Sequence, residues 1–316
     1  MPGLQVDGYF PDTSHTNTNH GWNHDAQFVI RLPRNWNGGL VVSGSPGVRA
    51  QYANDKSISD YVLSLGYAYA ATDKGNTGVE FFTDGLRPGD AIVEWNARTT
   101  QLARAARATV AQFYGHPARE VVAAGISNGG YLVRWQLENN PELYTRGVDL
   151  EGTLWTVDGP NLFTYLPQAI KGYEQHDPVA IVAAGFNPRS DFLWDYHYTV
   201  YWTLTQRIYT AELDPTYTGT EAEYDYAQRP DAHRAIRRIA LTGDIRRPLT
   251  TIHGTYDSLL PITQDSDVYA MMAHHTGLHT YQRVEGGNHV DGLVDAYPDR
   301  LVALVPVFQR AIRRPS

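Results

Sequence analysis

The sequence AGISNGGYLVRW, residues 124–135, places Ser127 between two glycines, each two residues away from it. The run REVVAAG, residues 119–125, comes just before and is apolar and β-prone, whereas residues 129–138 have helical character. The order is therefore strand, tight turn, helix. A serine at such a junction belongs either to an ordinary loop that starts a helix or to a turn that presents a nucleophile.

A nucleophilic serine makes further demands on the sequence. Its hydroxyl needs a base to take the proton, a group that orients the base, and donors for the developing oxyanion. GISNG, residues 125–129, fits the pattern G-x-S-x-G, in which the glycines avoid collisions and the helix N-terminus points at the reacting centre. Because five-residue patterns recur by chance, the pattern is informative only with an acid and a histidine after later strands.

Two later loops supply these groups in the expected chain order. The strand-like run LTTIH, residues 249–253, is followed by GTYDSLLP, which places Asp257 just past a strand end. The strand-like run TYQRV, residues 280–284, is followed by EGGNHVDG, which places His289 in a glycine-rich loop. The order Ser127, Asp257, His289 favours the nucleophile hypothesis over the loop hypothesis.

Composition limits the possible functions. The chain has 316 residues, of which 42% are hydrophobic, so it has enough apolar residues for a large core. A net charge of −8 argues against nucleic acid or an anionic membrane as a partner. The absence of cysteine excludes disulfides, thiolate zinc sites and a cysteine nucleophile. The N-terminal residues lack the pattern of a signal peptide, so as written they favour the cytoplasm, while a secreted protein whose leader was removed stays open.

Strand-like and helix-like segments alternate over most of the chain, which predicts a mostly parallel sheet with helices on both faces. The expected strands are residues 27–32, 40–43, 67–72, 121–124, 147–150, 249–253 and 280–284. The expected helices are residues 55–65, 90–115, 129–138, 264–275 and 293–312. The alternation stops between residues 153 and 237, where aromatic residues are frequent, so the chain is divided into core 1–152, helical cap 153–237 and core 238–316.

These motifs together resemble the α/β-hydrolase superfamily, and the resemblance covers nearly the whole chain. GISNGG is similar to the family's nucleophile elbow, HGTYDSLLP to its acid loop and GGNHVDG to its histidine loop. SGSPG, residues 43–47, resembles the family's oxyanion loop, with Ser43 in place of a histidine. The resemblance implies an α/β-hydrolase fold with an inserted, aromatic-rich, largely helical cap.

The resemblance also implies a role for each motif residue. Ser127 would be the nucleophile, His289 the base and then the acid, and Asp257 the group that orients His289. The backbone N–H groups of Asn128 and Ser45 would bind the oxyanion. The implied activity is that of a serine esterase that needs no metal or organic cofactor and acts on a small-molecule or oligomeric ester.

A narrower resemblance points to tannase, feruloyl-esterase and 3-hydroxybutyrate-oligomer-hydrolase relatives, which act on esters of aromatic or hydroxy acids. It rests on the S-N-G-G of the elbow and on the segments GLVVSGSPG and GYAYAATDKGNTG. The aromatic residues of the expected cap are either its own core or the lining of an acyl or alcohol pocket. For the lining, the candidates are Trp155, Phe163 and Trp194.

Several residues are rivals for these roles. Glu151 or Asp158, after the expected strand 147–150, could replace Asp257 as the acid, since some family members carry it there. His253, within the acid-loop motif, has a structural role by the same resemblance. The remaining rivals are expected to lie on the surface (His274, His275), to cap the last helix (Asp291, Asp295) or to belong to a solvated N-terminal loop rather than a metal site (His15, His20, His24).

Three function classes follow from this sequence. The first is hydrolysis of carboxylic esters through an acyl-enzyme. The second is a peptidase, amidase or acyltransferase that uses the same catalytic triad of Ser127, His289 and Asp257, because a fold does not determine the reaction. The third is a non-catalytic binding protein on the same fold.

Overall fold

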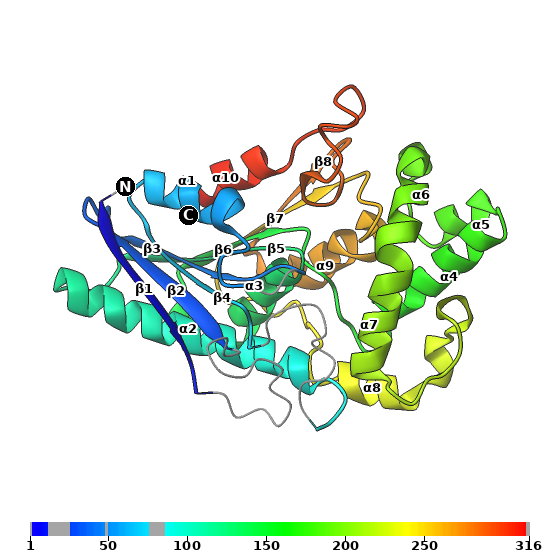
Figure 1. The fold of residues 1–316 in the computed structure, drawn as a ribbon, viewed down its shortest axis with the longest axis horizontal. Helices are drawn as coiled ribbons and strands as arrows, with labels where there is room; N and C mark the ends of the chain where they lie inside the picture. Colours follow the sequence, from blue (N-terminus) through cyan, green and yellow to red (C-terminus); the bar gives the residue numbers. More distant parts are fainter. Residues whose placement is uncertain (1, 12–25, 48–49, 76–85, 314–316) are drawn as a thin grey trace.

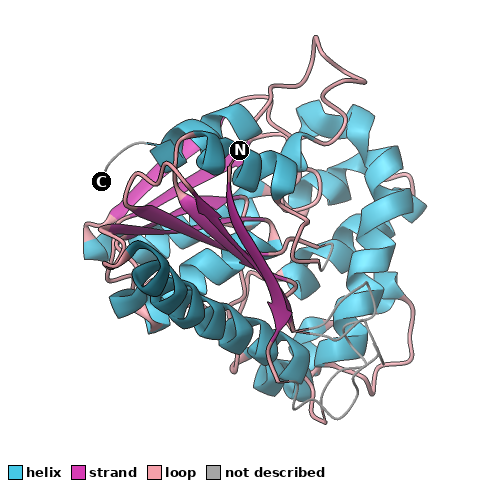
Figure 2. Cartoon of the chain, turned by 60° about the vertical axis from the view of Figure 1, so that its left-hand side comes forward, coloured by secondary structure: helices cyan, strands magenta, loops and turns pink. Residues whose placement is uncertain are grey.

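Eight strands form one sheet in the order β1-β2-β4-β3-β5-β6-β7-β8. The structure is a computed structural model that describes residues 2–11, 26–47, 50–75 and 86–313. Strands β1 and β4 pair with β2 in antiparallel fashion, and all other neighbours are parallel, so the sheet is mostly parallel, as predicted. Figure 2 shows the twisted sheet with helices around it. The strands are β1 (Gly3–Tyr9), β2 (Gln27–Pro33), β3 (Gly39–Gly44), β4 (Ala68–Thr72), β5 (Glu120–Ile126), β6 (Arg146–Leu150), β7 (Leu249–Gly254) and β8 (His279–Val284).

Alternating side chains of the central strands enter two separate cores. In β3, Leu40 and Val42 pack with α2 (Asp90–Tyr114) and α3 (Asn128–Asn139), whereas Val41 belongs to the core on the other face. That second core contains residues of α1 (Asp60–Ser64) and α10 (Val305–Arg313). Figure 1 shows these two pairs of helices on opposite sides of the sheet. Because both faces are covered, the strands read as nearly continuous apolar runs.

The segment between β6 and β7 is helical. Residues 153–237, all of which the structure describes, contain no strand. Their α-helices are α4 (Leu162–Glu174), α5 (Pro178–Ala183), α6 (Trp194–His197), α7 (Thr203–Leu213) and α8 (Pro230–Ile236). In Figure 1 these helices gather at one end of the sheet. We call residues 153–237 the helical insertion; its role as a cap over the site remains a prediction.

The last predicted helix is wrong over more than half of its length. Residues 293–312 were expected to be helical, but α10 begins only at Val305. Pro298 lacks an N–H and disfavours helical geometry in the residue before it, so the preceding segment forms turns instead. Asp291 accepts the backbone N–H groups of Leu304 and Val305, and so it caps the last helix as expected.

Strand β1 was not predicted. It is one of the two edge strands, pairs with β2, and leaves most of its side chains exposed. An edge strand needs few buried apolar residues, so its sequence carries little of the alternation that identifies a strand.

Candidate active site

Ser127 is the single residue between β5 and α3. Its φ of 57° and ψ of −122° are unfavourable for a residue with a side chain. The flanking glycines make this turn possible, since a Cβ on Gly125 would collide with the backbone of Gly129, and one on Gly129 with the carbonyl oxygen of Gly44. The turn therefore holds the Ser127 hydroxyl at the carboxyl end of the sheet, before the first turn of α3.

Loops after β7 and β8 bring an acid and an imidazole to this serine. The Nε2 atom of His289 lies 3.0 Å from the Oγ of Ser127, and its Nδ1 atom lies 2.8 Å from the Oδ2 of Asp257. A carboxylate beside Nδ1 places the ring hydrogen there, so Nε2 is free to accept the hydrogen of the Ser127 hydroxyl. The structure thus joins in one hydrogen-bonded row the three residues that the sequence singled out.

Asp257 is fully buried but well provided with donors. Its Oδ1 accepts the N–H groups of Leu259 and Leu260, each at 2.8 Å, and its Oδ2 lies within hydrogen-bond distance of both His289 and His253. Burial acts to raise the pKa of Asp257, but the charge of His289 and the hydrogen bonds from both histidines outweigh it and lower the pKa. Asp257 is therefore ionised at neutral pH.

His253 lies behind Asp257 and does not reach Ser127. Its Nε2 is 3.1 Å from Asp257 Oδ2 and 3.0 Å from the carbonyl oxygen of Leu260, so this nitrogen carries a hydrogen. Its Nδ1 is 2.7 Å from Ser266 Oγ, which accepts a hydrogen bond from Arg134. The contacts give His253 a supporting position, in agreement with the structural role that the resemblance implies.

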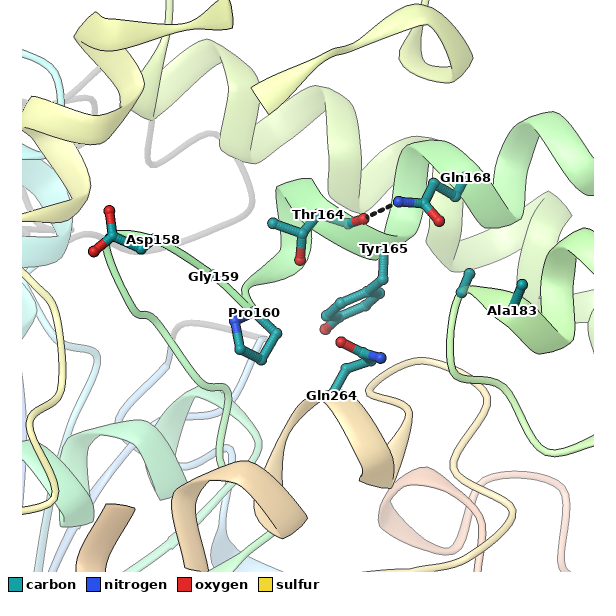
Figure 3. A pocket seen from close by; sticks show the side chains of 9 residues that line it. Asp158, Gly159, Pro160, Thr164, Tyr165, Gln168, Ala183 and Gln264 are labelled. Atoms are coloured by element: carbon teal, nitrogen blue, oxygen red, sulfur yellow. Dashed lines mark hydrogen bonds between the residues drawn. The ribbon is translucent and has the colours of Figure 1, made fainter. Parts of the chain in front are cut away.

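The two rival acids have different surroundings. The Oε2 of Glu151 lies 3.6 Å from His289 Nδ1, beyond hydrogen-bond distance. Asp158 lines a separate cavity of about 320 Å³, where Thr164 and Tyr165 of the helical insertion face Gln264 of the core (Figure 3). Asp257 is thus the carboxylate that hydrogen-bonds to His289.

One of the two predicted oxyanion donors is wrong. The N–H of Ser45 donates to the carbonyl oxygen of Thr72 at 3.1 Å, so it is already used between the ends of β3 and β4. The N–H of Asn128, at the start of α3, and the N–H of Gly47 make no hydrogen bond among the described residues. Both residues line the cavity that contains Ser127, so Gly47 replaces Ser45 as the second candidate donor.

A cavity of about 540 Å³ opens beside Ser127 and His289. Its wall is mainly apolar, and among the described residues it contains no Asp, Glu, Lys or Arg. One part of the wall comes from the loops and strand ends of the sheet. Another part comes from α4, α7 and the turn before α7 (Tyr198–Trp202). Apolar residues of the wall include Leu162, Val200, Leu204, Ile208, Leu259 and Val290.

The predicted pocket residues lie elsewhere. Trp155, Phe163 and Trp194 are buried in the hydrophobic core, and none of them lines the cavity beside Ser127. The rings of Trp155 and Phe163 pack edge to face with their centroids 5.7 Å apart, while Trp194 donates a hydrogen bond to Ser190. These large side chains fill the interior of the helical insertion, whereas Tyr201 and Tyr209 are the aromatic residues of the insertion that line the cavity, beside its aliphatic residues.

Other predictions concern metals and membranes. Glu151, His253 and Asp257 form a buried group with ligand atoms within 4.8 Å of one another. Hydrogen bonds within the protein already engage each of these side chains.

His274 and His275 are exposed, as expected, whereas His15, His20 and His24 lie outside the described residues. None of the described helices is both long and apolar enough to cross a bilayer.

Comparison with known proteins gives structural relatives only. No protein-family model and no curated protein sequence matches the chain. Feruloyl esterase B from Aspergillus oryzae is similar with a TM-score of 0.67 at 12% identity, over 91% of this chain and 73% of that one. An esterase from Aspergillus oryzae follows with a TM-score of 0.57 at 10% identity, over 84% and 70% of the two chains.

A peptidase is also among the similar structures. The acylaminoacyl peptidase of Pyrococcus horikoshii matches with a TM-score of 0.54 at 11% identity. The match covers 99% of this chain but only 41% of the peptidase, so this chain corresponds to less than half of that protein. At such low identities the likeness shows the fold, and it is the fold that the sequence motifs predict.

Proposed function

Since the chain has the α/β-hydrolase fold, we propose that it is a serine hydrolase that cleaves uncharged carboxylic esters. The observation that carries the proposal is the row of hydrogen bonds from Ser127 through His289 to Asp257, with Ser127 on a strained turn. A serine on a strained turn that is hydrogen-bonded to an imidazole, itself hydrogen-bonded to a buried carboxylate, has its hydroxyl activated for attack on a carbonyl carbon.

Acylation begins when Ser127 Oγ attacks the ester carbonyl carbon and its proton moves to His289 Nε2. Asp257 stabilises the resulting imidazolium through Nδ1. The negative oxygen of the tetrahedral intermediate accepts the N–H groups of Asn128 and Gly47. His289 then gives the proton to the leaving alkoxide oxygen, the C–O bond breaks, and the alcohol departs from the acyl-enzyme.

Deacylation repeats these steps with water. His289 takes a proton from the water as its oxygen attacks the acyl carbon, and a second tetrahedral intermediate forms in the same oxyanion site. His289 returns the proton to Ser127 Oγ as the acyl bond breaks. The sum is one ester and one water converted to one acid and one alcohol, with the protein unchanged.

The cavity supports an apolar, uncharged substrate. A charged group of a substrate would lose its hydration there without finding a charged partner among the described wall residues. The likeness to feruloyl esterase B agrees with the narrower resemblance in the sequence, so we propose esters of aromatic or hydroxy acids as the substrate class. The likeness to acylaminoacyl peptidase makes amide hydrolysis the second candidate.

The test is labelling with a fluorophosphonate, read by peptide mapping, beside the turnover of p-nitrophenyl butyrate and of butyryl p-nitroanilide. We expect a single adduct on Ser127 and faster turnover of the ester, with both lost in Ser127→Ala. Ser258, another buried serine beside a histidine, does not line the cavity and is expected to remain unlabelled. Full ester turnover by Ser127→Ala would refute the proposal, and faster turnover of the anilide would favour the amidase candidate.

A further inference from the structure

Two buried carboxylates face the same imidazole nitrogen. Glu151 follows the end of β6 and Asp257 follows the end of β7, and neither side chain is exposed. The Nδ1 atom of His289 lies 2.8 Å from Asp257 Oδ2 and 3.6 Å from Glu151 Oε2. The proposed mechanism uses Asp257 alone, so the buried carboxyl of Glu151 is left without a role.

Glu151 also binds the backbone on both sides of the site. Its Oε1 accepts the N–H of Gly254 at 3.2 Å, and its Oε2 accepts the N–H of Val290 at 2.8 Å. Its own φ is 52°, and the φ of Val290 is 46°, so both residues hold left-handed backbone conformations that cost free energy. This one side chain therefore connects the ends of β6 and β7 to the residue that follows His289.

The charge states of the two acids differ. Asp257 receives two backbone N–H groups and two imidazoles, whereas Glu151 receives two backbone N–H groups. Burial, with the charges of Asp257 and Asp291 added, raises the pKa of Glu151 well above its ordinary value. Because two buried neighbouring carboxylates do not both ionise readily, Asp257, which has more donors, ionises more readily than Glu151.

We propose that Glu151 is a second, positioning acid for His289, able to accept the Nδ1 hydrogen when the Asp257 carboxylate is absent. This inference rests on the proposed function, because it concerns the orientation of the proposed base. The groups that face Glu151 are Asp257, His289 and His253, with Asp291 farther along the histidine loop. Removal of Asp257 removes the main repulsive charge among them.

The consequence is a change in pH dependence. In Asp257→Ala, the repulsion that opposes ionisation of Glu151 is gone, so its pKa falls. Ionised Glu151 then accepts the Nδ1 hydrogen and keeps His289 in the tautomer that can take a proton from Ser127. The residual activity of Asp257→Ala should therefore rise with pH as Glu151 ionises, and Glu151→Gln should remove the part of the rise that comes from Glu151.

The experiment is a double-mutant cycle on the kcat/KM of p-nitrophenyl butyrate, measured from pH 5 to 9. We expect kcat/KM to fall by less than about fivefold in Glu151→Gln, by about 10²-fold in Asp257→Ala and by about 10⁴-fold in the double variant. The last value is expected because loss of the triad acid lowers the rate roughly 10⁴-fold where nothing replaces it. The inference is overturned if Glu151→Gln costs the same factor with and without Asp257.

Glu138→Gln is the matched control. Glu138 is also a buried carboxylate that accepts two backbone N–H groups, from Thr242 and Gly243, but it contacts Tyr269 and no residue of the triad. Its substitution should cost the same factor in both backgrounds. Circular dichroism and thermal unfolding establish the folding of each variant.

Two further outcomes are distinguishable. If Glu151→Gln fails to fold, the pH profile of Asp257→Ala decides, because a residual activity without a carboxyl ionisation contradicts the inference. Failure of the proposed function would instead appear in the unmodified protein, as no ester turnover and no adduct on Ser127.

Discussion

The two sides of Ser127 are built by different rules. We call the loops after β6, β7 and β8, with the side chains behind them, the polar side; it includes Asp257, His289, His253 and Arg134. We call the cavity wall from α4, α7 and the turn before α7 the apolar wall; it includes Ile208. On the polar side each group has a specific partner at hydrogen-bond distance, whereas the apolar wall consists of side chains that need only fit together.

The difference shows which parts of the site can vary without loss of the fold. Buried polar groups are costly unless each is paired, so a change on the polar side leaves a partner unsatisfied. Apolar contacts are not directional, and a change of similar volume is tolerated. We therefore expect the polar side to determine stability and reaction chemistry, and the apolar wall to determine which substrates are accepted.

The largest expected effect tests the far end of the polar side. Arg134 is fully buried and hydrogen-bonds to Asp149 at 2.6 Å and to Asp265 at 2.9 Å. Arg134→Met leaves two buried carboxylates without their cation and should lower the free energy of unfolding by about 3–5 kcal/mol. Denaturant unfolding followed by circular dichroism measures this change.

Arg189→Met is the control for that prediction. Arg189 pairs with Glu285 on the surface, where the two side chains are 70% and 65% exposed. Its loss should cost no more than about 1 kcal/mol. Equal losses for the two variants would show that burial does not distinguish the polar side from the surface.

An intermediate effect is expected where the helical insertion meets the polar side. His197 of α6 is buried against Ser258, and burial lowers its pKa to about 4. Between the unfolded pKa near 6.5 and this value, the unfolded chain binds a proton that the folded protein does not, so stability falls as pH falls. Between pH 7.5 and pH 5, this histidine should lower the free energy of unfolding by about 2 kcal/mol.

Urea unfolding of the unmodified protein and of His197→Gln at both pH values checks the contribution. The free energy of unfolding of the unmodified protein should fall by about 2 kcal/mol more than that of the variant over this interval, whatever the difference between their stabilities at pH 7.5. An identical pH dependence in the two proteins would contradict a neutral, buried His197.

The smallest expected effect concerns the apolar wall. Ile208 of α7 lines the cavity, and Ile208→Ala removes apolar contact with the substrate. We expect kcat/KM for p-nitrophenyl octanoate to fall by about tenfold and that for the acetate to change little, because only the longer chain fills the cavity. Val182→Ala on α5, away from the cavity, is the control. Equal effects on both esters would contradict a role of the wall in selectivity.

Much of the catalytic arrangement was accessible from the sequence for a physical reason. A nucleophilic serine requires a strained turn with small neighbours. Gly125 and Gly129 meet this requirement, and with Ser127 they form a five-residue pattern that can be found in the sequence. Asp257 and His289 each follow a recognisable strand, and parallel strands bring their carboxyl ends to one edge of the sheet. Their roles remain part of the proposal, whereas their proximity is a property of the fold.

Other features were not accessible in this way. The N–H of Ser45 is used by Thr72, which lies on another strand, so a motif confined to residues 43–47 could not reveal it. The prediction of Trp155, Phe163 and Trp194 as pocket residues fails because size and apolarity do not distinguish a buried interior from a cavity wall. From the sequence, Glu151 is only a rival to Asp257. That both acids lie near one imidazole depends on the positions of the ends of β6 and β7 in the fold.

The sequence alone predicts strands β2 to β8, the serine turn and the three residues that meet there. These follow from local conformational preferences and from the few residue types that a strained turn or an ionised pair tolerates. Tertiary packing sets which N–H groups stay free, which apolar side chains face the cavity, and how near Glu151 lies to His289. Those properties depend on contacts between residues far apart in the chain, where the nearest neighbour in space determines burial, charge and hydrogen bonding.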